Sequence, residues 1–167
     1  MNRGGTGAEP RFVVDVMLGK LAKWLRVLGF DARVAELRDP GQIESCRSQG
    51  FVPVTRREKF KGMENIVFIS TDRHLEQIKE LLTGLDLGED SFRLFTRCTI
   101  CNAQLHAISR EAAFGSVPDY IFETTSDFRT CLKCGRVYWP GSHKGRMIER
   151  LKSITTWDPR HEEAKNG

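Results

Sequence analysis

The sequence predicts an α/β fold with a largely parallel sheet, followed by a small cysteine-bearing module. Strand-like and helix-like segments alternate from residue 11 to residue 85, and paired cysteines with short β-prone pieces begin at Cys98. Alternating strands and helices in short connections are typical of a mostly parallel sheet covered on both faces. We therefore expect a boundary near residue 96.

The elements of the α/β part follow from local signals. The apolar run RFVVD predicts a strand over residues 11–15, and apolar residues at helical spacing predict a helix over residues 16–30 that Gly29 ends. A helix over residues 39–50 begins with Asp39 as its N-cap and Pro40 at its first position. The remaining predicted elements are strands over residues 31–37, 51–55 and 65–71 and an amphipathic helix over residues 72–85.

The part of the chain after residue 90 is predicted to be less regular in structure. Residues 91–96 read as one more strand, residues 119–125 and 135–141 are β-prone, and residues 142–154 read as a helix. The organisation that we expect is a flexible lead-in over residues 1–10, an α/β domain over 11–96, the module with its closing helix over 97–157, and a flexible tail over 158–167.

Composition narrows the class of protein. A chain of 167 residues accommodates one ordinary domain with a small appended module. Its apolar stretches are shorter than the roughly 20 residues that cross a bilayer, and the polar, Gly-rich start does not resemble a signal peptide. We expect a cytoplasmic protein that does not enter the membrane.

Positive charge is concentrated toward the C-terminus. The net charge is +4, and residues 129–167 hold nine Lys or Arg against four Asp or Glu, a local net charge of +5. Such a stretch fits a nucleic-acid contact surface, because neutralising phosphates drives that binding. It fits a solvated basic surface equally well.

Four of the five cysteines form two Cys-x2-Cys pairs, Cys98 with Cys101 and Cys131 with Cys134, 29 residues apart. Each pair can present two thiolates to one tetrahedral zinc ion. Disulfides are disfavoured in a chain without an export signal, and a redox dithiol would need one pair only. Four cysteine ligands leave no open position for water, so we predict a structural zinc site.

Acidic residues follow three predicted strands. Asp15 ends the first strand, Asp39 follows the second, and Asp72 follows the strand over residues 65–71. Carboxylates gathered at strand ends can hold Mg²⁺ or Mn²⁺ with the help of water and phosphate oxygens. Asp39 and Asp72 are also typical helix caps, so both interpretations stay open for them.

Several blocks of the sequence resemble one family. FVVDVMLGKLAKWLRVLGFD, VTRREKF, FTRCTICN and CLKCGRVYWPGSHKGRM, in this order across about residues 11–150, resemble the Mut-seven C-terminal ribonuclease-type domain family. The resemblance implies a PIN-like three-layer α/β/α sandwich with a C-terminal zinc ribbon, in which strand-end acids bind Mg²⁺ or Mn²⁺ to hydrolyse RNA. It assigns Asp15 as the acid of the first strand and the four paired cysteines as the ribbon ligands.

The third strand departs from the family pattern. Where the family has Thr-Arg-Asp, this chain has Thr55, Arg56 and Arg57, so a guanidinium replaces a carboxylate and is expected to pair with Asp15. Glu58 lies one residue further on, and such a shift points a strand-end side chain to the other face unless the turn redirects it.

The sequence favours a metal-dependent ribonuclease acting on single-stranded RNA. Asp15 is the central ligand in this hypothesis, Asp39 and Glu58 or Asp72 contribute, and Lys20 stabilises developing charge. The second hypothesis is an RNA-binding or interaction module that keeps the fold and the zinc while the acidic site has decayed. A third hypothesis, by analogy alone, is a toxin-type nuclease neutralised by a partner.

Overall fold

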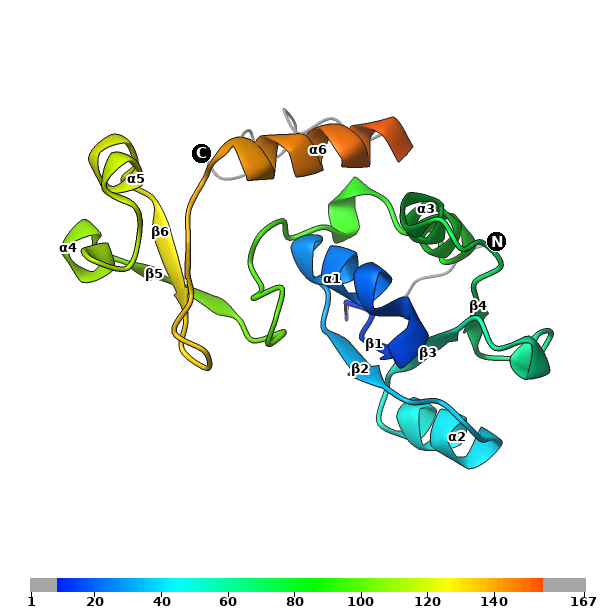
Figure 1. Cartoon of the computed structure of the whole chain (residues 1–167). Coiled ribbons are helices and arrows are strands. Elements are labelled where there is room, and N and C mark those ends of the chain that lie inside the picture. The colour runs from blue at the N-terminus through cyan, green and yellow to red at the C-terminus, as the bar shows by residue number, and fades with distance from the viewer. Residues whose placement is uncertain (1–8, 155–167) are drawn as a thin grey trace. The chain divides into compact units, whose positions relative to one another are not determined.

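The computed structural model describes residues 9–154 (Figure 1). Contacts divide the chain into two compact units, with the division between Asn102 and Ala103. Each unit is described separately. Among the helices of the described residues, none combines the length and apolar character needed to span a bilayer.

The first unit is built on a four-stranded parallel sheet in the order β2-β1-β3-β4. Val14 in the central strand β1 pairs with Val34 on one side and Val54 on the other. The strands are β1 (Phe12–Asp15), β2 (Ala32–Ala35), β3 (Val52–Thr55) and β4 (Val67–Phe68). The predicted parallel sheet is confirmed, and its carboxyl ends share one edge.

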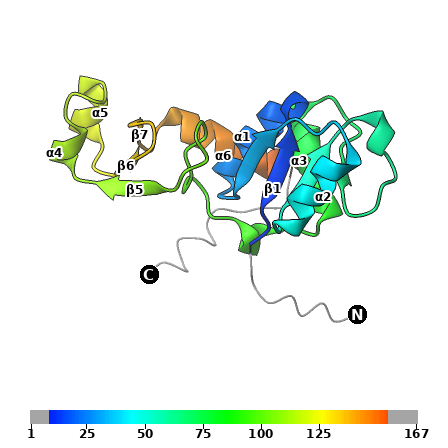
Figure 2. The ribbon, with the colours of Figure 1, turned by 90° about the horizontal axis from the view of Figure 1, so that it is seen from below.

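Helices cover both faces of this sheet, as Figure 1 shows and Figure 2 repeats from below. The helices α1 (Gly19–Val27) and α3 (His74–Gly84) lie on one face, and α2 (Pro40–Ser48) lies on the other. Short 3-10 turns are η1 (Val16–Leu18), η2 (Glu58–Phe60) and η3 (Glu89–Ser91). The α/β class of the prediction is therefore confirmed as a three-layer arrangement.

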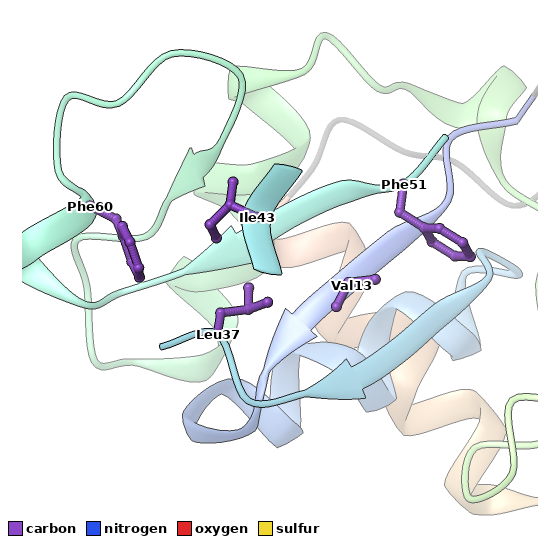
Figure 3. Close-up of a cluster of buried hydrophobic side chains, with 5 residues drawn as sticks. All are labelled: Val13, Leu37, Ile43, Phe51 and Phe60. Atoms are coloured by element: carbon purple, nitrogen blue, oxygen red, sulfur yellow. The ribbon is translucent and has the colours of Figure 1, made fainter. Parts of the chain in front are cut away.

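The core of the α2 face consists of five side chains drawn in Figure 3. These buried side chains are Val13 of β1, Ile43 of α2, Leu37, Phe51 and Phe60. Cys46 packs against it half-buried, and burial raises the pKa of its thiol. On the other face Leu21 and Leu25 of α1 and Ile78 and Leu81 of α3 are fully buried.

The start of α2 matches its sequence signals. The Asp39 carboxylate accepts a hydrogen bond from the Gln42 backbone N–H at 3.0 Å, and the Gln42 side chain accepts one from the Asp39 N–H at 3.2 Å. This reciprocal pair is a capping box, with Pro40 at the first helical position. The predicted N-cap is confirmed.

The strand predicted over residues 91–96 is wrong. Its backbone N–H groups go to the end of α1 instead of a sheet: Arg93 N–H donates to the Leu28 carbonyl at 2.8 Å and Phe95 N–H to the Val27 carbonyl at 2.9 Å. Phe95 is in the left-handed region at φ 57°, which a strand residue does not adopt. The segment satisfies the last carbonyls of a helix rather than extending the sheet.

The second unit contains a three-stranded antiparallel sheet in the order β5-β6-β7. Its strands are β5 (Leu105–Ile108), β6 (Phe128–Cys131) and β7 (Val137–Tyr138), and its helices are α4 (Arg110–Ala113), α5 (Asp119–Thr124) and α6 (Ser142–Ile154). The predicted helix over residues 142–154 is confirmed as α6.

The β-prone interpretation of residues 119–125 is wrong, because this segment forms α5. The Pro118 carbonyl accepts from the N–H groups of Ile121 and Phe122, which starts a helical turn. Ile121 of α5 then buries its side chain in a cluster with Ala113 of α4, Val117 of the connecting segment and Phe128 of β6. This tertiary packing overrides the strand preference of the aromatic and β-branched residues.

Gly29 is expected to be essential for the fold. It lies at φ +97°, and a Cβ atom there would come 2.2 Å from the Arg93 carbonyl oxygen. Urea unfolding of Gly29→Ala should show a free energy of unfolding lower by about 3 kcal/mol. Gly84→Ala is the control: its Cβ would meet no heavy atom within 4 Å, and the change should stay within about 1 kcal/mol. Equal stabilities of the two variants would contradict the close approach.

Candidate functional site

Asp15 is the acid that the fold buries at the carboxyl edge of the sheet. It ends the central strand β1 and none of its surface is exposed to solvent. The Thr55 hydroxyl at the end of β3 donates to its Oδ2 at 2.7 Å. The backbone N–H of Leu37, which follows β2, also bonds to this carboxylate. Three neighbouring strands thus deliver polar groups to one point.

Arg57 makes the remaining hydrogen bonds to the Asp15 carboxylate. Its Nε donates to Oδ2 at 2.7 Å and its Nη2 to Oδ1 at 3.3 Å, so the guanidinium engages both carboxylate oxygens. The Arg57 backbone N–H bonds to the Thr55 hydroxyl at 3.2 Å, which holds the residue beside the strand end. A two-point pair of this kind is strong and geometrically specific. The predicted pairing of Arg57 with Asp15 is confirmed.

Further charges surround this Asp15–Arg57 ion pair. Arg57 Nη2 lies 3.7 Å from Glu36 Oε1, and Arg38 Nε lies 2.7 Å from the same oxygen. The Arg57 side chain is 27% exposed, whereas that of Arg38 is 69% exposed. Opposite charges therefore alternate from the buried Asp15 outward to solvent.

The hydrogen bonds decide the ionisation of Asp15. Burial alone would raise its pKa, but the hydrogen bonds from Arg57 and Thr55 and the positive charge of Arg57 outweigh burial and lower the pKa below the usual value. Hydrogen bonding to Asp15 in turn raises the pKa of Arg57. Both groups are charged at neutral pH, and the carboxylate is already saturated with donors.

Glu58 lies outside this arrangement. It begins the turn η2, its side chain is 77% exposed, and its carboxylate lies 3.6 Å from Lys61 Nζ. The chain turns directly after Arg57, so the residue next to the strand end points to solvent. The structure does not place Glu58 beside Asp15.

The other predicted site residues are separate as well. Asp39 is engaged in the capping box of α2, and Lys20 is exposed on α1. Asp72 is exposed, and the N-cap of α3 is Arg73, whose N–H bonds to the Thr71 hydroxyl. Within residues 9–154 no hydrogen bond or ion pair joins Asp15 to Asp39, Glu58, Asp72 or Lys20.

Two hydrogen-bond partners of Asp15, Thr55 and Leu37, are not predicted by the sequence. Thr55 belongs to the third-strand motif, and its hydroxyl binds Asp15. A hydroxyl residue at the end of a buried strand could have indicated this contact. The N–H of Leu37 leaves no trace in the sequence, because any residue other than proline could supply it.

The four paired cysteines form the second candidate site. Their Sγ atoms all lie within 4.8 Å of one another. Cys98 and Cys131 are fully buried, Cys101 is half-buried and Cys134 is exposed. The predicted gathering of these four residues is confirmed.

The two pairs share one local conformation, which we call the first hook (residues 98–102) and the second hook (residues 131–135). Asn102 N–H donates to the Cys98 carbonyl at 2.9 Å, and Gly135 N–H donates to the Cys131 carbonyl at 2.8 Å. Both residues are left-handed, at φ 64° and 73°. In the first hook the Cys101 N–H also donates to Cys98 Sγ at 3.3 Å.

This donor set fits a tetrahedral thiolate site. Sulfur atoms about 2.3 Å from one zinc ion lie about 3.8 Å apart, which is within the spacing of the four Sγ atoms. An N–H group directed at a sulfur stabilises the thiolate form that binds metal. The four cysteines can therefore hold a metal ion.

Comparison with known proteins shows the family of this chain. The model of one family, described as the Mut7-C RNAse domain, matches residues 10–151. The chain belongs to this family. Searches of curated proteins and of solved structures gave no match. Membership in the Mut7-C family connects the chain with ribonuclease chemistry and with RNA as substrate or partner.

Removal of Arg57 should expose the cost of a buried unpaired charge. In Arg57→Gln the free energy of unfolding at pH 7 should fall by about 3 kcal/mol, because Asp15 keeps its burial and loses its cation. The control Arg38→Gln removes an exposed pair and should change stability by less than about 1 kcal/mol. Denaturant unfolding measures both, and equal effects would contradict the central role of Arg57.

The same variant should invert the pH dependence. In the wild type the lowered pKa of Asp15 stabilises the fold fully above pH about 4, and this contribution is lost as the pH falls through the folded value. In Arg57→Gln burial dominates and raises the pKa, so the unfolding free energy should increase as the pH falls from 7 toward 5. A pH profile parallel to that of the wild type would refute this.

Proposed function

We propose that this Mut7-C chain is an RNA-binding module whose strand-end acid site is closed by the Asp15–Arg57 ion pair. The observation that carries the proposal is the bidentate contact of Arg57 with both oxygens of the buried Asp15. In this interpretation the fold and the cysteine site are kept, and the metal-dependent cleavage is lost.

The charge of Arg57 opposes a divalent ion at Asp15. A unit positive charge about 4 Å from a dication repels it by about 8 kcal/mol at an effective dielectric constant of about 20. Displacing Arg57 would also break two hydrogen bonds to the carboxylate. The residues present at this point therefore do not fit Mg²⁺ or Mn²⁺, and we derive no catalytic step through such an ion.

RNA as the partner rests on the family and on charge. The second unit carries the basic stretch that begins at Arg129, and release of counterions from phosphates favours binding to such a surface. We propose single-stranded RNA, whose unstacked bases can pack on exposed rings. Phe114 and Tyr120, with 73% and 67% exposure, offer such rings.

Metal-dependent ribonuclease activity is the second candidate, and family membership favours it. It requires Arg57 to leave Asp15, and it requires further carboxylates from Asp39, Glu58 or Asp72 to move toward the strand end. Lys20 on α1 would then face the developing charge. The two candidates differ in one measurable property, cleavage that depends on both Mn²⁺ and Asp15.

A binding and cleavage assay separates the two functions. A labelled single-stranded RNA should bind the wild type, with affinity that falls as salt rises. Cleavage in millimolar Mn²⁺ should be the same for wild type and Asp15→Asn, a residual background. Cleavage by the wild type that Asp15→Asn abolishes would establish the ribonuclease instead, and absence of RNA binding would reject RNA as the partner.

For the four cysteines we propose a structural zinc ion held by Cys98, Cys101, Cys131 and Cys134. When bound, zinc would supply a cross-link between the two hooks, and the thiolates leave no position for a reacting water. Such ligands stay reduced in the cytoplasm, which is the location that we propose.

Metal analysis tests this assignment. The wild type should contain about one zinc per chain, and Cys131→Ser should lose it together with stability, because binding energy of a structural zinc contributes to folding. Cys46→Ser is the matched control, since Cys46 lies in α2 apart from the cluster, and its zinc content should equal that of the wild type. Zinc retained in Cys131→Ser would overturn the ligand set.

A further inference from the structure

The first hook is fixed by side chains of its own unit. Arg26, in the last turn of α1, donates from Nη1 to the Thr99 carbonyl at 2.9 Å and to the Ile100 carbonyl at 3.0 Å. Its Nε donates to the Ala32 carbonyl at 2.9 Å. One guanidinium thus joins the turn between the two cysteines to the first residue of β2.

Asn102 fastens the other end of the hook. Its side-chain oxygen accepts the Ala32 N–H at 3.1 Å, and its side-chain nitrogen donates to Asp31 Oδ1 at 2.6 Å. Arg97 Nη1 donates to the Asn102 carbonyl at 2.8 Å. The residue that closes the turn at φ 64° is therefore held from three directions.

The positive charge of Arg26 also suits a metal site at the first hook. Burial lowers the pKa of Arg26, and the attraction of Cys98, Cys101 and Asp31 opposes this lowering. A zinc ion with four thiolates carries a net charge of about −2, which a neighbouring half-buried cation stabilises. Arg26 supplies such a cation without being a ligand.

The second hook is held in a different way. It lies in the turn between β6 and β7, where the Cys131 N–H donates to the Arg136 carbonyl at 3.0 Å and the Thr130 hydroxyl donates to the same carbonyl at 3.3 Å. These contacts come from its own hairpin. Gly135 stands at the position of Asn102 and has no side chain with which to anchor the turn.

We propose that Arg26, together with Asn102, is a positioning residue that holds the first hook in ligand geometry before the metal binds. This inference rests on the zinc site proposed for the four cysteines. The first hook is the more firmly held half of the site, because side chains outside the hook bind it. Pre-organised ligands raise affinity because less ordering accompanies binding.

Zinc affinity measured by competition with a chelator tests the proposal on the full chain. Arg26→Met should weaken zinc binding about 10-fold to 100-fold, the usual effect of losing a residue that orients metal ligands. Lys23→Met removes an equal charge from an exposed position of the same helix, and it should bind zinc as the wild type does. Arg26→Lys keeps the charge without the forked contacts and should also be weakened.

A second variant keeps the test decisive if Arg26→Met does not fold. Asn102→Gly retains a residue suited to φ 64° and removes only the side-chain contacts, so zinc should again bind more weakly. Wild-type affinity in both Arg26→Met and Asn102→Gly would overturn the inference. Absence of zinc binding by the wild type would instead overturn the metal assignment on which it rests.

Hydrogen exchange on the zinc-free wild type gives an independent readout. The amides of Asn102 and Gly135 make equivalent bonds within their hooks, so a difference in exchange reports how firmly each hook is held. The Asn102 amide should exchange more slowly than the Gly135 amide. Equal exchange, or slower exchange at Gly135, would contradict a preformed first hook.

Discussion

A buried carboxylate needs a partner, and in this chain Arg57 meets that need for Asp15. The ion pair joins the end of β1 to the segment after β3. Thr55 at the end of β3 strengthens this link, because its hydroxyl bonds to both Asp15 and the Arg57 backbone. Leu37 after β2 adds its N–H to the same carboxylate. The carboxyl edge of the sheet is thus organised around the negative charge of Asp15, which Arg57 of the same chain neutralises.

This arrangement links fold and function. Parallel strands bring their carboxyl ends to one edge, where ligands usually bind in such sheets. In a family associated with RNA cleavage, that edge here presents a guanidinium and a saturated carboxylate. The cysteine site is independent of this change, since its ligands and their supports lie elsewhere in the sequence. The proposed loss of cleavage and the proposed structural zinc site are therefore compatible.

The sequence predicted the features for which residue type and spacing give a signal. Asp39 and Pro40 predicted the start of α2, the spacing of the cysteines predicted that they come together, and the place of Arg57 after the third strand predicted its pairing with Asp15. Residues 91–96 were misjudged because their partners, the last carbonyls of α1, are distant in sequence. The outward direction of Glu58 depends on the turn η2, which no residue pattern revealed.

Arg57 is expected to keep divalent ions away from Asp15. Paramagnetic broadening by Mn²⁺, followed by NMR on the carboxyl carbon of Asp15, measures this directly. In millimolar Mn²⁺ the Asp15 signal of the wild type should remain sharp and should titrate below the usual range of aspartate. Selective broadening of that signal would show an ion bound at the strand end and would contradict the closed site.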